Sequence, residues 1–470
     1  MERTLTTRTM TWVRETLDAS GDLVRAELRE SATASWSGVV IDSRAECADR
    51  IFFAIPGETT DGHRFAPDAF RAGSPAVVIS VPAAAQELDV MKAPYFLVRD
   101  SRAALTTLAR AYRLLLDARV IAITGSSGKT TTKEYTRAVL RTRYRVHANP
   151  GNLNSLVGVP MTILSADEDC EFLVCEAGAN HRGEIDVLGS LLRPDVAVIT
   201  NIGDAHVGYF GSRDAIAQEK GSLLRHLGEG GHAVLPRDDM YFDRLCASVQ
   251  GKVSSFGRSD RADFRLGNPG FAHGRLTFSV NGEPLALSAV GEYNALNACA
   301  AFAVGDICGV DAGRMREAFA AIQATPGRGR VHTVAGVTVI DESYNASPAS
   351  MRKSVAMLAS LPATRRIAVL GDMRELGDHA DELHRSVGVE VAERKIDRLY
   401  WLGEYGTPVR DAARAMRPST GVELYTEMAA LIRAVASEVR LGDIVLVKAS
   451  RGTRLDEFVS GLLDRLQARS

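Results

Sequence analysis

The sequence predicts an α/β protein of three domains, each built around a mainly parallel sheet. Short apolar runs alternate with helical patterns over most of the chain, which is typical of parallel strands joined by crossover helices. The 470 residues suffice for two to four domains of ordinary size. The run PGRGR at 326–330 is typical of a linker. We therefore expect domains at 1–117, 118–328 and 329–470.

The composition is that of a soluble globular protein, with 46% hydrophobic and 24% charged residues. The formal net charge of −2 argues against a nucleic-acid binder. The apolar stretches are far shorter than the ~20 residues of a membrane span, and the first ten residues lack the apolar core of a signal peptide. Six cysteines without a C-x-x-C pair predict buried thiols in a reducing cytoplasm. We expect a cytoplasmic monomer.

The strands of the three domains are predicted from apolar runs bounded by polar turns. In the first domain these runs are 38–41, 51–55 and 76–79, and polar turns lie at 42–44 and 61–63. The second domain has runs at 120–123, 172–175 and 196–200. The third has runs at 337–340, 367–370, 399–402 and 444–447, which indicates a small Rossmann-like domain. It lacks G-x-G-x-x-G after its first strand, so we do not expect it to bind a dinucleotide.

A phosphate-binding loop follows the strand at 120–123. The loop residues are Gly125, Ser126, Ser127, Gly128, Lys129, Thr130 and Thr131, and a helical pattern follows them. Glycines let backbone N–H groups face phosphate oxygens, the lysine reaches the β- and γ-phosphates, and Thr130 is suited to bind Mg²⁺. Ile123 stands where the general P-loop pattern has glycine, so this is a T-G-x-x-G-K-T variant. The alternative is an ordinary glycine turn with a solvated lysine.

Two polar residues at the ends of neighbouring strands are candidates for a metal or phosphate site. Glu176 follows the run 172–175, at the place where a P-loop protein needs a carboxylate for Mg²⁺. His206 follows the run 196–200 in the string TNIGDAH. Ligands bind at the carboxyl edge of parallel sheets, which favours a functional role for both. A solvent-facing glutamate and a structural histidine are the alternatives.

Lys220 lies on the apolar stripe of a helix predicted at 212–227. Ile216, Leu223, Leu224 and Leu227 share that stripe, so the lysine faces protein. Burying an unpartnered ammonium is costly. Lys220 therefore either extends its amine to the edge of the stripe or meets a charged or modified partner in a site.

The order of the motifs resembles that of the Mur ligase family. The shared strings are TGSSGKTTT, NPGNLNSLVGVPMTIL, EAGAN, TNIGDAHVGYFGS, QEKGSLL, GEYNALNA, GRGRV, DESYNASP, LGDMRELG and VKASRGTRLDEF. They extend from about residue 38 to about residue 460, and ten motifs in order are far more specific than any one of them. The resemblance implies a domain for the UDP part of the substrate, a central ATPase domain and a Rossmann-like domain for the incoming amine.

The resemblance also implies roles for individual residues. Lys220 corresponds to the lysine that family members carry as a carbamate, which together with Thr130, Glu176 and His206 would serve the metal, with two Mg²⁺ ions expected. Lys129, Lys220 and His206 are the expected catalytic residues. The ATP contacts implied beyond the loop are Asn294, Asn297, Arg330, Asp341, Glu342, Tyr344 and Asn345. Either Asp341 or Glu342 would bind the ribose.

The substrate residues implied by the resemblance lie in three places. Ser43, Arg44, Asp61, Gly62 and His63 resemble the uridine-diphosphate pocket. Asn152, Asn154 and Ser155 resemble the loop for the muramoyl part, although the family usually has N-L-N-N where this chain has N-L-N-S. Lys448, Ser450 and Arg451 resemble the loop near the incoming dipeptide, and a surface salt bridge is the alternative for Arg451.

The implied reaction is the ATP-dependent joining of D-alanyl-D-alanine to a UDP-N-acetylmuramoyl tripeptide through an acyl-phosphate. The family members that add a single amino acid to the shorter precursor carry D-Y-A-H-T-P and D-N-P-R, and neither string occurs here. Three competing functions are those of a regulatory NTPase, a folylpolyglutamate synthetase and a non-enzymatic UDP-sugar-peptide binder. The sequence leaves open the third residue of the peptide, diaminopimelate or lysine, and the exact dipeptide.

Overall fold

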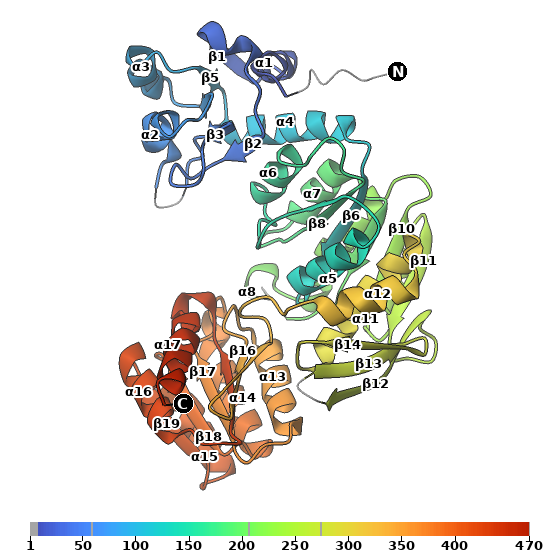
Figure 1. Cartoon of the computed structure of the whole chain (residues 1–470), viewed down its shortest axis with the longest axis vertical. Helices are drawn as coiled ribbons and strands as arrows, with labels where there is room; N and C mark the ends of the chain where they lie inside the picture. Colours follow the sequence, from blue (N-terminus) through green and yellow to red (C-terminus); the bar gives the residue numbers. More distant parts are fainter. Residues whose placement is uncertain (1–7, 58–59, 205–206, 273–274, 470) are drawn as a thin grey trace. The chain divides into compact units, whose positions relative to one another are not determined.

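The computed structural model describes residues 8–57, 60–204, 207–272 and 275–469 (Figure 1). They form three sheets, each with its own helices, so the chain has the predicted three α/β domains. By compactness the chain divides differently, into two units. One holds residues 8–122, 144–179 and 183–195, and the other holds residues 123–143, 180–182 and 196–469.

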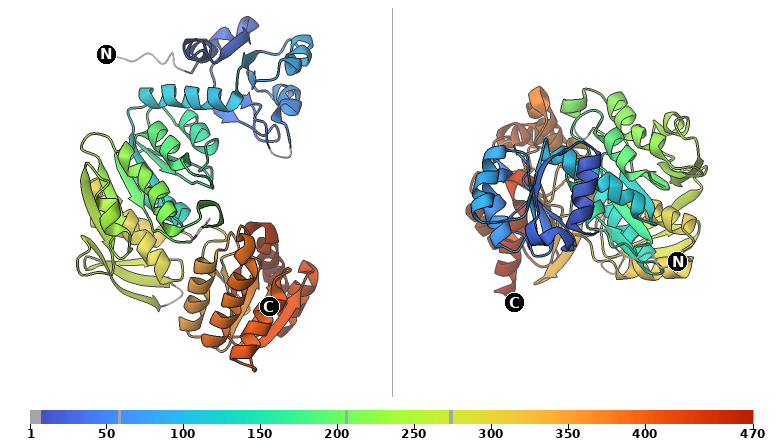
Figure 2. Two further views of the ribbon diagram at one scale, coloured as in Figure 1. Left: turned by 180° about the vertical axis from the view of Figure 1, so that it is seen from behind. Right: turned by 90° about the horizontal axis from the view of Figure 1, so that it is seen from above.

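The first sheet has five strands in the order β1-β5-β4-β3-β2. Only β1 is antiparallel to its neighbour. Its strands are β1 (Leu23–Glu27), β2 (Gly38–Val40), β3 (Arg50–Phe53), β4 (Val77–Ile79) and β5 (Tyr95–Val98). The helices are α1 (Met10–Ala19), η1 (Arg29–Thr33), η2 (Gly62–Phe65), α2 (Ala66–Arg71), α3 (Pro82–Val90) and α4 (Ser101–Leu115). Figure 2 shows this blue domain from behind and from above. The three predicted strands are confirmed as β2, β3 and β4.

The second sheet has nine strands in the order β14-β13-β12-β11-β10-β9-β6-β8-β7. The strands are β6 (Arg119–Thr124), β7 (Val146–Ala148), β8 (Phe172–Glu176), β9 (Val196–Ile199), β10 (His232–Pro236), β11 (Lys252–Gly257), β12 (Phe264–Ala272), β13 (Arg275–Val280) and β14 (Glu283–Leu287). The last three form an antiparallel meander beside parallel strands. The helices are α5 (Lys129–Arg141), α6 (Gly158–Leu164), α7 (Glu184–Leu192), α8 (Val207–Phe210), α9 (Arg213–Gly221), η3 (Ser222–His226), α10 (Phe242–Cys246), α11 (Glu292–Ile307) and α12 (Ala312–Ala321).

The third sheet has six strands in the order β15-β16-β20-β17-β18-β19, and only β15 is antiparallel to its neighbour. Its strands are β15 (Arg330–Val334), β16 (Val337–Asp341), β17 (Arg366–Gly371), β18 (Arg398–Leu402), β19 (Gly421–Tyr425) and β20 (Ile444–Lys448). The helices are α13 (Pro348–Ser360), η4 (Gly377–His379), α14 (Ala380–Glu393), α15 (Gly406–Met416), α16 (Met428–Glu438), η5 (Arg451–Thr453) and α17 (Leu455–Gln467).

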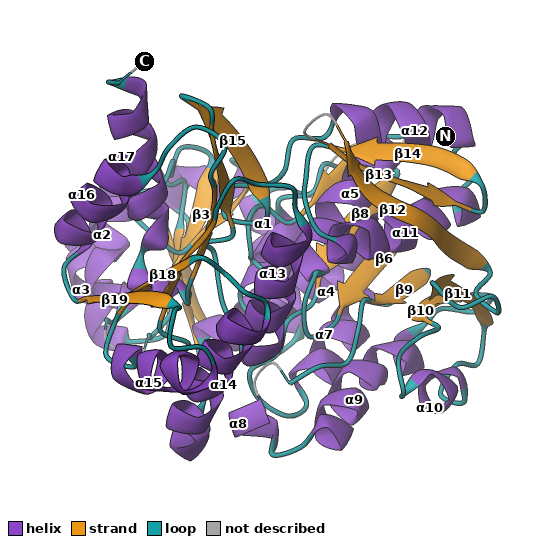
Figure 3. Cartoon of the chain, turned by 90° about the horizontal axis from the view of Figure 1, so that it is seen from below, coloured by secondary structure: helices purple, strands orange, loops and turns teal. Residues whose placement is uncertain are grey.

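Two separate apolar cores cover the faces of the third sheet. Buried residues of α13, α14 and α15 form one core, and buried residues of α16 and α17 form the other. The two sets of helices lie on opposite sides of the strands (Figure 3). Every apolar run predicted as a strand in the second and third domains is a strand.

The helix predicted at 212–227 is corrected. α9 ends at Gly221, and the chain continues as the 3-10 helix η3. The hydroxyl of Ser222 donates to the carbonyl of Glu219 at 2.6 Å, which tightens the turn. A side chain at Gly221 would press against Leu245 of α10, with its Cβ 3.2 Å from Leu245 Cδ2. The missing side chain at Gly221 therefore lets this corner pack closely, and Lys220 still faces protein, as predicted.

Candidate active site

The phosphate-binding loop joins β6 to α5 as predicted. Gly125 has φ 149° and Gly128, which caps α5, has φ 81°, so both need a backbone conformation that favours glycine. A Cβ atom at Gly125 would overlap with Thr200, and one at Gly128 would overlap with Asn297. The loop is thus held closely by Thr200, which follows β9, and by Asn297 of α11, with no room for a side chain at either glycine.

Lys129 and Thr130 occupy the first positions of α5. The amine of Lys129 bends back over its own loop and donates to the carbonyl of Gly125 at 2.9 Å. Thr130 and Thr131 are buried. The N-terminal N–H groups of a helix attract anions, and a cation above the loop adds to that attraction. This arrangement is suited to holding phosphate groups.

A second loop, after β9, holds the phosphate-binding loop in place. The side chain of Asn201 accepts from the N–H of Ser127 at 3.1 Å and donates to its carbonyl at 2.9 Å. The N–H of Gly203 donates to Ser126 Oγ at 2.8 Å. Asp239, after β10, accepts from the N–H of Ile202 at 2.8 Å. Neither Asn201 nor Asp239 was among the predicted site residues, because their partners are distant in sequence and only the TNIGDAH string pointed to this loop.

Lys220 is almost completely enclosed on α9, with 2% of its surface exposed. Burial, and to a smaller extent the positive charge of Lys129, lower the pKa of its amine to about 7. A neutral amine is therefore available near neutral pH. This confirms the expectation that Lys220 faces protein.

Glu176 ends β8 and meets the loop predicted for the muramoyl part. Its carboxylate, buried at 2% exposure, accepts from Asn154 Nδ2 at 2.6 Å. Its N–H donates to Asn149 Oδ1 at 2.9 Å. Ser155 Oγ accepts from the N–H of Gly158 at 3.2 Å, so it supports the start of α6. Asn152 is exposed on the same loop.

His206 lies outside the described residues. In the part of the chain that the structure describes, no group of three or more histidine, cysteine, aspartate and glutamate side chains is placed to hold a metal. The expected metal set differs from such a group, because it includes a threonine hydroxyl and a modified lysine.

The two predicted asparagines of α11 are both buried and contact different segments. Asn297 lies against Gly128. Asn294 donates to the carbonyl of Val290 at 2.7 Å and lies beside Gly329 in the linker. Arg330 is exposed at the start of β15.

Asp341 and Glu342 are both buried, and protein donors bind both carboxylates. Asp341 accepts from the N–H of Gly327 at 2.8 Å and from Ser343 Oγ at 2.6 Å. Glu342 accepts from the hydroxyls of Tyr293 and Ser354, and the Lys448 amine lies 3.4 Å from it.

The predicted residues after β20 lie beside the loop after β16. The Lys448 amine also donates to the carbonyl of Asn345 at 3.0 Å. Ser450 Oγ accepts from the N–H of Arg374 at 2.9 Å. The guanidinium of Arg451 lies 5.4 Å from the ring centre of Tyr344, within cation–π range. The alternative of a surface salt bridge for Arg451 is not found among the described residues.

The predicted uridine-diphosphate residues lie on two loops of the first domain. Arg44 pairs with Asp42, 2.7 Å between Nη2 and Oδ2, and this hydrogen bonding lowers the pKa of Asp42 to about 2. Ser43, between them, is half-buried.

The second of these loops is built around a histidine. Asp61 accepts from the Nδ1 of His63 at 2.6 Å, and His63 Nε2 accepts from the N–H of Ser80 at 2.8 Å. The hydrogen bond from His63 lowers the pKa of Asp61. Gly62 is required, because its Cβ would lie 2.7 Å from backbone atoms of Ile55.

Three family models match the chain. They are the Mur ligase family catalytic domain over residues 35–113, the Mur ligase middle domain over 123–305, and the Mur ligase glutamate ligase domain over 327–451. The UDP-N-acetylmuramoyl-tripeptide–D-alanyl-D-alanine ligase of Bacillus subtilis is 36% identical over 433 residues, which are 91% of this chain and 93% of that protein. The chain belongs to the Mur ligase family.

Solved structures resemble this Mur ligase over nearly its whole length. A crystal structure of MurF from Acinetobacter baumannii has a TM-score of 0.85 at 28% identity and covers 96% of this chain and 98% of its own. MurF from Thermotoga maritima in complex with ADP has a TM-score of 0.77 at 28% identity, with coverage of 92% and 98%.

The family matches contain most of the candidate residues of this Mur ligase. The middle-domain match includes Lys129, Glu176 and Lys220, and the glutamate-ligase match ends at Arg451. Within the described ranges, no helix combines the length and the apolar character needed to cross a membrane.

Proposed function

We propose that this Mur ligase joins D-alanyl-D-alanine to the terminal carboxylate of a UDP-N-acetylmuramoyl tripeptide, with ATP converted to ADP and phosphate. The observation that carries this proposal is similarity over nine-tenths of the chain to the Bacillus subtilis ligase of that name. The phosphate-binding loop supports it, since Lys129 and the start of α5 form a site for phosphate groups.

The proposed chemistry has two steps. The tripeptide carboxylate attacks the γ-phosphorus of ATP, which forms an acyl-phosphate and releases ADP. The amine of the dipeptide then attacks the acyl carbon, phosphate leaves, and the amine loses a proton. Lys129 offsets the negative charge that accumulates on the transferred phosphate. No protein nucleophile is required, so catalysis rests on positioning and electrostatics.

Mg²⁺ is the metal that suits the candidate ligands, because a buried carboxylate and a threonine hydroxyl are oxygen donors. We propose that Thr130, Glu176, His206 and Lys220 serve two such ions, whose charge would offset that of the phosphates. Lys220 contributes as a carbamate, formed when its neutral amine adds CO₂ and loses a proton. Its burial and its lowered pKa support this modification.

The remaining residues are proposed to bind the two organic substrates and the nucleoside of ATP. Residues 1–117 would hold the UDP part through Ser43, Arg44, Asp61, Gly62 and His63. Asn152, Asn154 and Ser155 would meet the muramoyl part. Residues 118–328 would hold ATP with Asn294 and Asn297, and residues 329–470 would hold the dipeptide. Nucleotide-linked substrates and six cysteines that form no disulfide support a cytoplasmic location.

The test is phosphate release with ATP and Mg²⁺ when UDP-muramoyl tripeptide and D-Ala-D-Ala are added singly and together. We expect release only with both substrates, and a product mass equal to that of the joined peptides. Release without either substrate would refute ligation and indicate a regulatory NTPase. Activity with a single amino acid on the shorter UDP-muramoyl dipeptide would assign the chain to the other type of Mur ligase.

A further inference from the structure

Strand β20 lies where the connections that leave the strands of the third sheet change from one face of the sheet to the other. Its neighbours β16 and β17 are both followed by helices on one face, α13 and α14, whereas β20 is followed by α17 on the opposite face. Crevices open beyond the carboxyl ends of neighbouring parallel strands whose connections leave in opposite directions, and ligands bind there. We therefore expect such a crevice on each side of the loop after β20, toward β16 and toward β17.

The loops after β20 and β17 meet at Gly452 and Arg374. A Cβ atom at Gly452 would lie 2.8 Å from both Cζ and Nε of Arg374, so the guanidinium lies directly against the glycine. The N–H of Arg374 also donates to Ser450 Oγ at 2.9 Å. Gly452 has no positive φ, so its function here is to leave space for the guanidinium.

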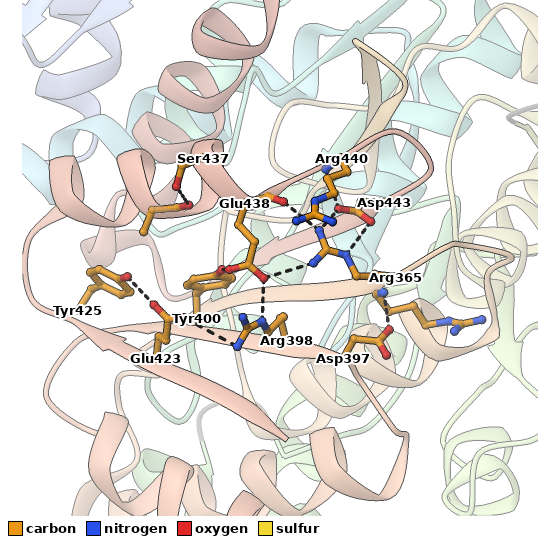
Figure 4. Close-up of polar contacts among 12 residues, drawn as sticks. Arg365, Asp397, Arg398, Tyr400, Glu423, Tyr425, Ser437, Glu438, Arg440 and Asp443 are labelled. Carbon is orange, nitrogen blue, oxygen red and sulfur yellow. Dashed lines mark hydrogen bonds and ion pairs between the residues drawn. The ribbon is translucent and has the colours of Figure 1, made fainter. Parts of the chain in front are cut away.

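Arg374 and Arg451 are both exposed, and neither has a carboxylate within 4 Å among the described residues. At the opposite edge of the same sheet, where the amino ends of the strands lie, arginines do have carboxylate partners. There Arg365 pairs with Asp443 at 2.6 Å, and Arg398 pairs with Glu438 at 2.7 Å (Figure 4). Arg365 and Arg398 are thus neutralised by protein carboxylates. Arg374 and Arg451 have no such partner, although the guanidinium of Arg451 lies against the ring of Tyr344, so their charge is left for a ligand.

We propose that Arg374, on the loop after β17, binds the carboxylate of the incoming dipeptide. Arg451, on the neighbouring loop after β20, is the second cation beside this crevice. This inference rests on the proposed function. The amine of the dipeptide must stay free to attack, so the carboxylate is its one charged group available for anchoring. A planar guanidinium matches a carboxylate with two parallel hydrogen bonds. Lys448 is less available, since Glu342 and the carbonyl of Asn345 already hold its amine.

The test compares D-Ala-D-Ala with D-alanyl-D-alaninamide, which lacks the negative charge. For each variant, kcat/KM is measured for both acceptors at saturating ATP and UDP-muramoyl tripeptide. We expect the wild-type protein to prefer the acid, and Arg374→Gln to lower kcat/KM for the acid about tenfold or more while the amide changes little. Arg374→Lys should retain part of the preference. Arg385→Ala, which removes an exposed arginine from α14, is the matched control.

A second variant avoids removing the arginine. Gly452→Ala should push the guanidinium of Arg374 aside and reduce the preference for the acid without altering the KM for ATP. If Arg374→Gln lowers activity equally on both acceptors, or changes neither, the inference is wrong although the proposed function stands. If the wild-type protein ligates neither acceptor, the proposed function itself fails.

Discussion

Asp239 is expected to control nucleotide binding although it does not belong to the phosphate-binding loop. Its two carboxylate oxygens accept from the N–H groups of Ile202 at 2.8 Å and Tyr241 at 3.0 Å. Ile202 lies between Asn201 and Gly203, which hold Ser127 and Ser126. Asp239→Ala therefore removes a hydrogen-bond acceptor from the loop after β9, and that loop holds the phosphate-binding loop in place.

The size of the effect follows from these bonds. A hydrogen bond to a charged group contributes about 1.5–3 kcal/mol, and Ile202 is buried, so its N–H would be left with little access to water. If the loop conformation that binds ATP is destabilised by about 1.4–2.8 kcal/mol of this free energy, the KM for ATP rises roughly 10- to 100-fold. Asp239→Asn keeps one good acceptor, so about half of that free energy should be lost.

The assay is phosphate release with varied ATP, together with thermal unfolding. The KM for D-Ala-D-Ala should change less than that for ATP. Asp243→Asn is the control, since its side chain is 99% exposed on the same surface. If Asp239→Ala lowers the melting temperature but leaves the KM for ATP within twofold, the aspartate only stabilises the fold and the reasoning is refuted.

Three further predictions concern the basic side chains Lys129, Lys220 and His384. Lys129→Ala should reduce turnover at least about a hundredfold, and near-normal phosphate release would refute its proposed role. Lys220→Ala should be nearly inactive, with partial rescue by short carboxylic acids, and full activity without rescue would mean that Lys220 only packs. His384 accepts from the N–H of Met373 at 2.9 Å, and burial lowers its pKa. The neutral imidazole therefore stabilises the fold fully at pH values above its pKa in the unfolded chain, near 6.5. As the pH falls from there toward the lower pKa of the folded protein, the free energy of unfolding decreases by at most about 1.4 kcal/mol per pH unit. His384→Gln should flatten the fall in melting temperature between pH 7 and 5, and a parallel curve would contradict this.

The sequence predicted well what depends on local pattern. Strands buried in parallel sheets are continuous apolar runs, so β6, β8 and β20 could be located directly. The place of Lys220 on the buried side followed from helical spacing, although the helix ends earlier than predicted. Edge strands such as β1 and β15 lack such runs, because one face is exposed, and they were not predicted.

Contacts between distant segments could not be predicted in this way. Nothing in the pattern around Asp239 indicates that its carboxylate reaches the loop after β9, since 37 residues separate the two groups. The same holds for Arg374, whose partner Gly452 lies on another strand loop. Such pairs arise because parallel strands bring their carboxyl ends to one edge, and strand order was not readable from the sequence.

The pair Asp341 and Glu342 illustrates how the structure changes a question that the sequence left open. The two acids were alternatives for binding the ribose, but each carboxylate already has protein donors. Asp341 fixes Gly327 of the linker. Glu342 joins Tyr293 at the start of α11 to Lys448 at the end of β20, so it ties together segments implied in ATP and dipeptide binding. A ribose hydroxyl would have to share or displace one of these donors. At Glu342 they are the hydroxyls of Tyr293 and Ser354 and the Lys448 amine, which also donates to the carbonyl of Asn345. Binding of the nucleoside at Glu342 would therefore act on a residue that contacts Lys448 beside the proposed dipeptide crevice, whereas binding at Asp341 would act on a residue that holds the linker.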